Sequence, residues 1–152
     1  INLQGDEPFI NPKDIVNLNN NIILKNSDVG TLGNKITKVD FIDKSIVKVI
    51  TKDNIEKKRI SIAKKFLRKC NYPRKNTYGH IGIYQFRTSI LKKFVNLRQS
   101  KNEIKHRLEQ LRAIENGINI DVVYSKNKSF GIDTVEDYVE IKKIMEYKIK
   151  KL

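Results

Sequence analysis

Segments with helical spacing of apolar residues alternate along this chain with short strand-like segments. Asn11 and Pro12 predict a helix start, because asparagine caps helix N-termini and proline suits the first helical position. Residues 80–87 predict a strand, because their residue types alternate between two faces. Further strands are expected at residues 45–51, 59–63 and 119–124, and further helices after a Thr88 cap, over residues 103–115 and after Asp133–Thr134. Such alternation favours an α/β layered domain.

The composition restricts the chain to one domain of ordinary size. Its 152 residues are 39% hydrophobic, which suffices for a core, and no apolar run reaches the roughly 18 residues of a membrane span. The single cysteine, Cys70, excludes an internal disulfide and a zinc site built from cysteines. No basic-then-apolar signal segment opens the chain. We therefore expect a cytoplasmic location and no membrane partner.

The positive charge is concentrated in the middle of the chain. The net charge is +14, and residues 35–112 alone carry 22 basic and 6 acidic side chains. A basic domain suggests a nucleic-acid partner. However, 24 of the 31 basic residues are lysines, and the chain also has 23 isoleucines and 16 asparagines, a bias that an AT-rich coding sequence produces. Specific readers of nucleic acid use arginine for bidentate contacts. We therefore interpret the charge as a solvated lysine-rich surface and expect no specific nucleic-acid partner.

The first eight residues indicate a strand that leads into an acidic turn. The chain opens with Ile1, and its only methionine is Met145. We expect residues 1–3 to be the end of a buried strand, and therefore expect the chain to be a fragment of a longer protein. Residues 4–8 (QGDEP) follow that strand, where ligands bind in open α/β sheets, so Asp6 can ligate a hard divalent cation. A plain Asp–Pro turn is the alternative.

Three other segments carry candidate polar ligands. Residues 80–84 (HIGIY) place a histidine and a tyrosine on one strand face, either to line a substrate pocket or as an ordinary half-exposed strand. Residues 108–112 (LEQLR) place a glutamate and an arginine at helical spacing, which is also typical of a surface pair. Residues 131–134 (GIDT) place an aspartate where it can bind a ligand or cap the last helix.

In this order, the motifs together resemble one family. QGDEP, HIGIYQFR, LEQLRAIENG and GIDTVED are similar to motifs of the 3-deoxy-manno-octulosonate cytidylyltransferases, the CMP-Kdo synthetases of Gram-negative bacteria. The resemblance runs from Ile1 to about Met145 and covers only the last three-fifths of such an enzyme. It implies an α/β nucleotidyltransferase fold, a Rossmann-like mixed sheet flanked by helices, with the N-terminal part missing. Residues 1–152 would be the C-terminal part of a single cytidylyltransferase domain.

The resemblance also implies an activity and a site. Such enzymes transfer CMP from CTP to 3-deoxy-D-manno-octulosonate (Kdo) for lipopolysaccharide biosynthesis, release pyrophosphate, require Mg²⁺ and are homodimers. By the family pattern, Asp6 and Asp133 are catalytic and ligate the metal, which suits hard oxygen ligands from distant chain positions. The substrate-binding residues implied are Gln4, Lys64, His80, Tyr84, Glu109 and Gln110.

The chain departs from the family pattern at several positions. Where the family has a YFSR strand, residues 61–64 read SIAK, so Lys64 stands in place of an arginine. A lysine keeps the positive charge but lacks the bidentate fork of the guanidinium. A second family glutamate is His106 here. The glycine- and basic-rich loop that cradles the CTP phosphates is absent, so we expect the fragment alone to be inactive.

Two alternatives stay open: a non-catalytic relic that binds sugar acid or dimerises, and a basic nucleic-acid-binding domain.

Overall fold

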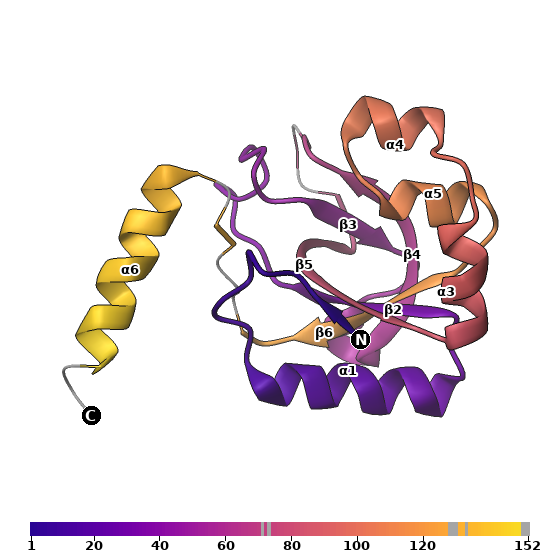
Figure 1. Cartoon of the computed structure of the whole chain (residues 1–152), viewed down its shortest axis with the longest axis horizontal. Coiled ribbons are helices and arrows are strands. Elements are labelled where there is room, and N and C mark those ends of the chain that lie inside the picture. Colours follow the sequence, from indigo (N-terminus) through magenta and orange to yellow (C-terminus); the bar gives the residue numbers. More distant parts are fainter. Residues whose placement is uncertain (71, 73, 128–130, 133, 150–152) are drawn as a thin grey trace.

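The computed structural model describes residues 1–70, 72, 74–127, 131, 132 and 134–149 (Figure 1). Six strands and six helices are found among these residues. In chain order they are β1 (Asn2–Leu3), α1 (Pro12–Lys25), β2 (Val29–Asn34), β3 (Lys48–Thr51), α2 (Ile55–Lys58), β4 (Ile60–Leu67), β5 (Thr77–Phe86), α3 (Thr88–Val95), α4 (Lys101–His106), α5 (Gln110–Glu115), β6 (Ile120–Ser125) and α6 (Val135–Ile149).

The strands form one mixed sheet in the order β1-β5-β2-β6-β4-β3, with a further pairing between β5 and β3. Strand β2 pairs parallel with β6 and antiparallel with β5. The long strands β4 and β5 each change partner along their length, because one end of each lies in the main sheet and the other end flanks β3. The mixed sheet with helices on both faces confirms the expected α/β architecture.

One face of the sheet packs against α1. Asn11 caps this helix by accepting a hydrogen bond from the backbone N–H of Lys13 at 2.9 Å, and Pro12 occupies the first turn, as predicted. Leu18 and Ile22 are buried against the strands together with Leu32, Ile81, Ile83 and Val123. Gly30 allows this contact, because a Cβ there would lie 2.2 Å from the side chain of Ile22.

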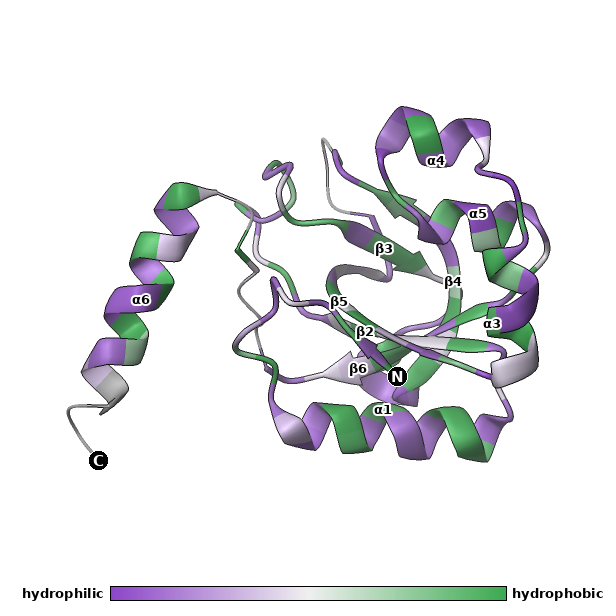
Figure 2. Ribbon diagram, in the orientation of Figure 1, coloured by the Kyte–Doolittle hydropathy of each residue, from purple (hydrophilic) through white to green (hydrophobic). Residues whose placement is uncertain are grey.

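The opposite face of the sheet packs against α3 and α5, and α4 contacts α5; the three helices cluster on the right in Figure 1. Val29, Phe66, Ile120 and Val122 are buried on this side, and partly buried side chains of α3 and α5 pack on them. Figure 2 shows hydrophobic segments along the central strands, whereas α1 and α6 alternate between hydrophobic and hydrophilic positions. Helix α6 stands to one side of the sheet, on the left of the view. No helix among the described residues is long and apolar enough to cross a membrane.

Several local expectations need correction. Residues 1–3 are exposed instead of buried, because β1 pairs only with β5 at the edge of the described sheet. Thr88 is the first residue of α3 instead of its cap, since Arg87 holds the N-cap position without a side-chain hydrogen bond. The helix expected over residues 103–115 is two helices, because Arg107 adopts a left-handed conformation (φ 52°) that ends α4. Strand β2 and the short helix α2 were not predicted.

Candidate functional site

An open pocket of about 560 Å³ lies on the α3–α5 side of β5. Its walls come from the turn after β1, the end of β2, the loop before β3, strand β5, the α4–α5 connection and the segment around the start of α6. Six residues that the sequence indicated as ligands line this pocket: Gln4, Asp6, His80, Tyr84, Glu109 and Gln110. The fold therefore gathers side chains from three sequence motifs at one site.

The acidic turn after β1 is fastened to strand β5. The backbone N–H of Glu7 donates to the carbonyl of Gln4 at 3.2 Å, and the Glu7 carboxylate accepts from the N–H of Gly82 at 2.9 Å. A Cβ at Gly82 would lie 2.5 Å from Oε1 of Gln4, so a larger residue there would push the end of the Gln4 side chain aside. Glu7 thus positions Gln4 and Asp6 against the pocket, a role that the sequence motif did not reveal.

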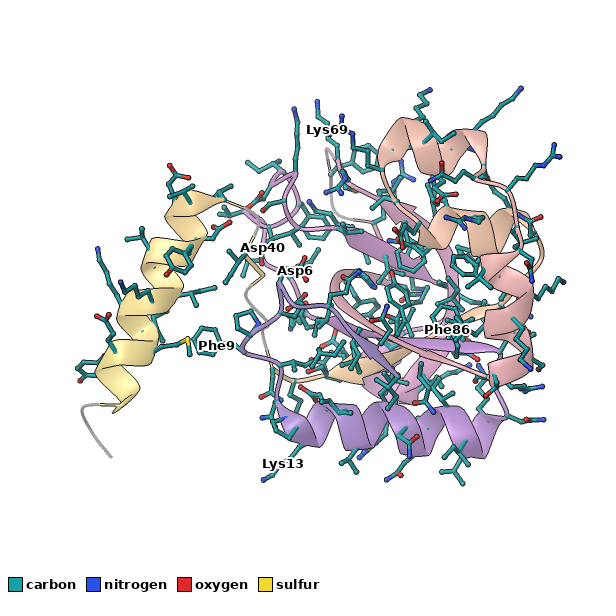
Figure 3. The ribbon with its side chains drawn as sticks, in the orientation of Figure 1. Asp6, Phe9, Lys13, Asp40, Lys69 and Phe86 are labelled. Atoms are coloured by element: carbon teal, nitrogen blue, oxygen red, sulfur yellow. The ribbon has the colours of Figure 1, made fainter. Side chains whose placement is uncertain are left out.

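Asp6 lies next to the chain segment that carries the GIDT motif. The backbone N–H of Ile132 donates to the carbonyl of Asp6 at 2.8 Å, and Gly131 lines the same pocket. Asp133 lies outside the described residues. Figure 3 shows Asp6 and Asp40, both lining residues of the pocket, on the side of the molecule that faces α6. The backbone contact brings two segments more than a hundred residues apart in sequence to one place.

His80 is held on the pocket wall in its neutral form. By surface area the ring is only half-buried, but it packs edge-on against Phe66, with ring centroids 5.3 Å apart, and beside Tyr84. Desolvation by this burial lowers the pKa of His80 to about 4 from 6.5, so the ring is neutral at pH 7. Its Nε2 lies 2.9 Å from Oγ1 of Thr31, whose hydroxyl donates to the carbonyl of Ile83 at 2.7 Å. We therefore assign the proton to Nε2, which leaves Nδ1 as the acceptor of the ring.

Tyr84 adds a hydrogen-bond donor to the same wall. Burial, together with the negative charge of Glu109, raises the pKa of the Tyr84 hydroxyl, so it stays protonated at neutral pH. Its ring lies between those of His80 and Phe86, at centroid distances of 5.4 and 6.2 Å. The alternation expected for residues 80–87 is confirmed here, because Ile81, Ile83 and Gln85 contact the α1 side while His80 and Tyr84 face the pocket.

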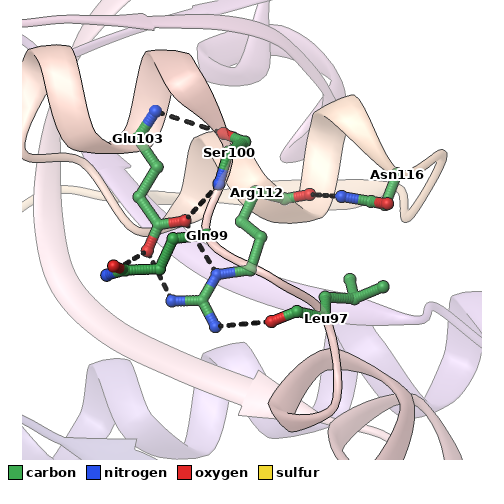
Figure 4. A network of polar contacts seen from close by, with 6 residues as sticks. All are labelled: Leu97, Gln99, Ser100, Glu103, Arg112 and Asn116. Atoms are coloured by element: carbon green, nitrogen blue, oxygen red, sulfur yellow. Dashed lines mark hydrogen bonds and ion pairs between the residues drawn. The ribbon is translucent and has the colours of Figure 1, made fainter.

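Glu109 and Gln110 reach the pocket through the connection between α4 and α5. Glu109 is exposed, whereas Gln110 is 8% exposed. An ion pair beneath them joins the two helices (Figure 4): Nε of Arg112 donates to Oε2 of Glu103 at 2.8 Å, and a second nitrogen of Arg112 bonds the other carboxylate oxygen. The hydrogen bond from Arg112 holds the pKa of Glu103 below its usual value. Ser100 completes a capping box with Glu103 at the start of α4.

Lys64 is not brought into the pocket. It lies on β4 at a bulge, since Ile50 of β3 pairs with Lys65 while the next residue, Thr51, pairs with Ala63. Lys64 is exposed and is not among the residues that line the pocket. Charged residues that the sequence did not single out line it instead: Lys35, Asp40, Asp43, Arg68, Arg107 and Asp137. They belong to loops and element ends with no distinctive spacing, so only the fold reveals them.

Comparison with known proteins defines the class of this chain. Residues 1–147 match the cytidylyltransferase family, so the chain belongs to that family. Among its relatives, 3-deoxy-manno-octulosonate cytidylyltransferase of Thermodesulfovibrio yellowstonii is 43% identical over 145 residues, covering 90% of this chain and 56% of the relative. The enzyme of the same name from Bartonella tribocorum is 35% identical over 147 residues, covering 95% of this chain and 60% of the relative.

A solved structure carries a similar fold. It is described as CMP:2-keto-3-deoxy-manno-octonic acid synthetase complexed with CTP, and it superposes with a TM-score of 0.82 at 32% sequence identity. The match covers 97% of this chain and 61% of that structure. The nucleotidyltransferase fold expected from the sequence is confirmed. The chain spans somewhat more than half the length of the curated relatives it matches.

Proposed function

We propose that this chain is the C-terminal, sugar-acid-binding part of a 3-deoxy-manno-octulosonate cytidylyltransferase. The whole enzyme would transfer CMP from CTP to Kdo and release pyrophosphate, and its product would serve lipopolysaccharide biosynthesis. The observation that carries this proposal is the pocket, which gathers six residues of the family motifs around one cavity. The sequence relatives and the CTP-bound structural relative support it.

The metal site we propose is made by Asp6 and Asp133 and would hold Mg²⁺. The donor at Asp6 fits this ion, because its carboxylate is exposed at the pocket and is a hard oxygen ligand. The contact between Ile132 and Asp6 supports a second ligand from the GIDT segment. A bound Mg²⁺ would neutralise negative charge that develops on the α-phosphate during transfer.

The remaining pocket residues would position the sugar acid for in-line displacement. The oxygen of its anomeric hydroxyl would form a bond to the α-phosphorus of CTP while the bond to pyrophosphate breaks, and the hydroxyl proton would be lost. Tyr84 and Gln110 would donate hydrogen bonds to sugar hydroxyls. The carboxylate of Glu109 and the neutral ring of His80 would accept hydrogen bonds from them. Orientation of the two reactants would then supply much of the catalysis.

A chimera tests whether these residues are catalytically competent. The N-terminal segment of the Thermodesulfovibrio relative that precedes its match would be fused to Ile1 of this chain. We expect release of pyrophosphate that requires CTP, Kdo and Mg²⁺ together, whereas the 152-residue chain alone is expected to be inactive. An inactive but folded chimera, beside an active relative, would favour the alternative of a non-catalytic relic.

Two further parts of the proposal concern assembly and location. We propose a homodimer in the cytoplasm, with CTP and Kdo as its substrates and with no membrane or specific nucleic-acid partner. Sedimentation of the active chimera tests the dimer, because its mass in solution reports the number of chains directly. A purely monomeric active species would contradict this part while leaving the activity intact.

A further inference from the structure

The pocket carries more negative than positive side chains among the described residues. Its carboxylates are Asp6, Glu7, Asp40, Asp43, Glu109 and Asp137, and its cationic side chains are Lys35, Arg68 and Arg107. His80 adds no charge at neutral pH, because burial keeps it neutral. A sugar acid is an anion, so it must meet one of the few cations in a field of carboxylates. Which of these cations binds the sugar acid is a question that rests on the proposed function.

Arg68 is fixed in place from both its backbone and its side chain. Its Nε donates to the carbonyl of His106 at 3.1 Å, and one terminal nitrogen donates to the carbonyl of Arg107, also at 3.1 Å. Its own carbonyl accepts from the buried ammonium of Lys48 at 3.2 Å. A guanidinium has five N–H donors, so two backbone contacts leave further donors for a ligand. Arg68 is itself exposed, but these contacts hold it at the pocket as a pre-oriented cation, so binding costs it little side-chain entropy.

The other cations near the site are placed differently. Lys64, where the family has an arginine, is exposed outside the pocket. Lys35 forms an ion pair with Glu56 at 3.8 Å, and its side chain is 74% exposed. Arg107 also lines the pocket, but its guanidinium makes no hydrogen bond or ion pair with the residues that the structure describes, and its backbone carbonyl is an acceptor for Arg68.

We propose that Arg68 binds the carboxylate of the sugar acid. Its guanidinium supplies the bidentate fork that matches a carboxylate, which the lysines near the site cannot supply. It does so from the end of β4, where the α4–α5 connection orients it toward the pocket. Arg68 is thus a specificity residue that selects an acid over a neutral sugar.

If Arg68 had only a structural role, its loss would change ligand binding in a different way. The carbonyls of His106 and Arg107 lie at the end of α4, where positively charged side chains commonly satisfy the last carbonyls of a helix. If that were its whole role, loss of Arg68 would weaken binding of charged and neutral sugars alike. If Arg68 binds the carboxylate, its loss removes the preference for the charged ligand specifically.

The test is a calorimetric titration of the 152-residue chain with Kdo and with its neutral C1 amide. We expect the unchanged chain to bind Kdo about 10- to 100-fold more tightly than the amide, the range for a charge-assisted hydrogen bond. Arg68→Gln, whose amide can still donate to a helix-end carbonyl, should abolish that preference and leave amide binding nearly unchanged. Lys69→Gln is the matched control, because Lys69 is the next residue, is exposed and does not line the pocket.

Each outcome of this titration decides the proposal. Retention of the preference in Arg68→Gln overturns it while the proposed function stands. If Lys64→Gln or Arg107→Gln loses the preference while Arg68→Gln keeps it, the residue changed in that variant binds the carboxylate of the sugar acid instead. Equal weakening of acid and amide in Arg68→Gln shows a structural role only. If the unchanged chain binds neither ligand, both this inference and the sugar-acid site of the proposed function are overturned.

Discussion

The protonation state of His80 connects the pocket to the stability of the fold. In the folded chain burial lowers its pKa to about 4, whereas an unfolded histidine titrates near 6.5. Between these values the unfolded chain binds the extra proton, so we expect the free energy of unfolding to fall as pH decreases from 6.5 toward 4. The full loss is on the order of 3 kcal/mol. Urea unfolding across this range measures it.

The histidine variants separate this contribution from general acid denaturation. His80→Gln should show a shallower loss of stability with acid, because the titrating group is gone. His106→Gln keeps His80 and serves as the matched control, since His106 is exposed on α4. The same steep acid dependence in His80→Gln as in the unchanged chain would contradict the assignment.

The two proposed metal ligands also make a residue-scale prediction. In the active chimera, Asp6→Asn and Asp133→Asn should each lower the rate of pyrophosphate release by at least about a hundredfold, because the ion that stabilises the transition state is lost. The fold should persist, since Asp6 is exposed. A full rate in either variant at saturating Mg²⁺ would remove that residue from the metal site. Asp53→Asn, which lies outside the pocket, is the control.

At the scale of elements, the connection between α4 and α5 depends on one ion pair. Glu103 is 3% exposed, and Arg112 lies over the ring of Phe94 with its Cζ 4.8 Å from the ring centroid. Removing one partner leaves a buried charge unpaired, so Arg112→Met should lower the free energy of unfolding by roughly 3 kcal/mol or more. Lys58→Met breaks the exposed pair with Asp53 and should cost at most about 1 kcal/mol.

Chemical denaturation of both variants compares the buried pair with the exposed one. Sugar-acid binding should weaken in Arg112→Met as well, because Glu109 and Gln110 flank the connection that the ion pair stabilises. The double variant Glu103→Leu with Arg112→Met should regain part of the lost stability, since no buried charge is then left alone. Equal small losses in Arg112→Met and Lys58→Met would show that the buried pair contributes little.

The elements that the sequence predicted are those with explicit local signals. The Asn11–Pro12 cap and the alternation around His80 each report a local preference that the fold retains. Strand β2 escaped prediction because Gly30 and Gly33 weaken its strand character, and both glycines are required by close packing that only the fold reveals. The break at Arg107 was hidden because a left-handed arginine has no sequence signature.

The candidate site was predictable to the extent that its motifs are local in sequence. Gln4, His80, Tyr84 and Glu109 were indicated by their motifs, and the fold places them around one pocket. Lys64 was indicated by position, but a bulge in β4 leaves both it and the following lysine exposed. A bulge changes which face a side chain occupies without changing the residue count, so sequence position alone did not place this cation. Arg68 lines the pocket where its side chain bonds the backbone at the end of α4, and this tertiary contact also has no signal in the sequence.

At the scale of the whole molecule, a chain with a net charge of +14 contains a pocket whose described carboxylates outnumber its cations. The excess charge is on exposed lysines of several elements, among them Lys57, Lys92 and Lys105 on three different helices. A recognition helix would instead gather arginine and amide side chains on one face to reach base edges. The arrangement supports the interpretation of a solvated lysine surface, and it is consistent with the proposed function, in which anionic substrates bind in a specific pocket.

A solvated lysine surface predicts weak, unspecific DNA binding. Exposed lysines on α2, α3 and α4 can contact phosphates but lack the bidentate base contacts of arginine, so affinity should stay at about 10⁻⁴–10⁻⁶ M at physiological salt. Fluorescence anisotropy with two duplexes of unrelated sequence measures this directly. We expect equal affinities for both duplexes and loss of binding as salt is raised, because released counterions supply the whole driving force. Nanomolar binding that distinguishes the two sequences at about 0.15 M salt would instead support the nucleic-acid-binding alternative.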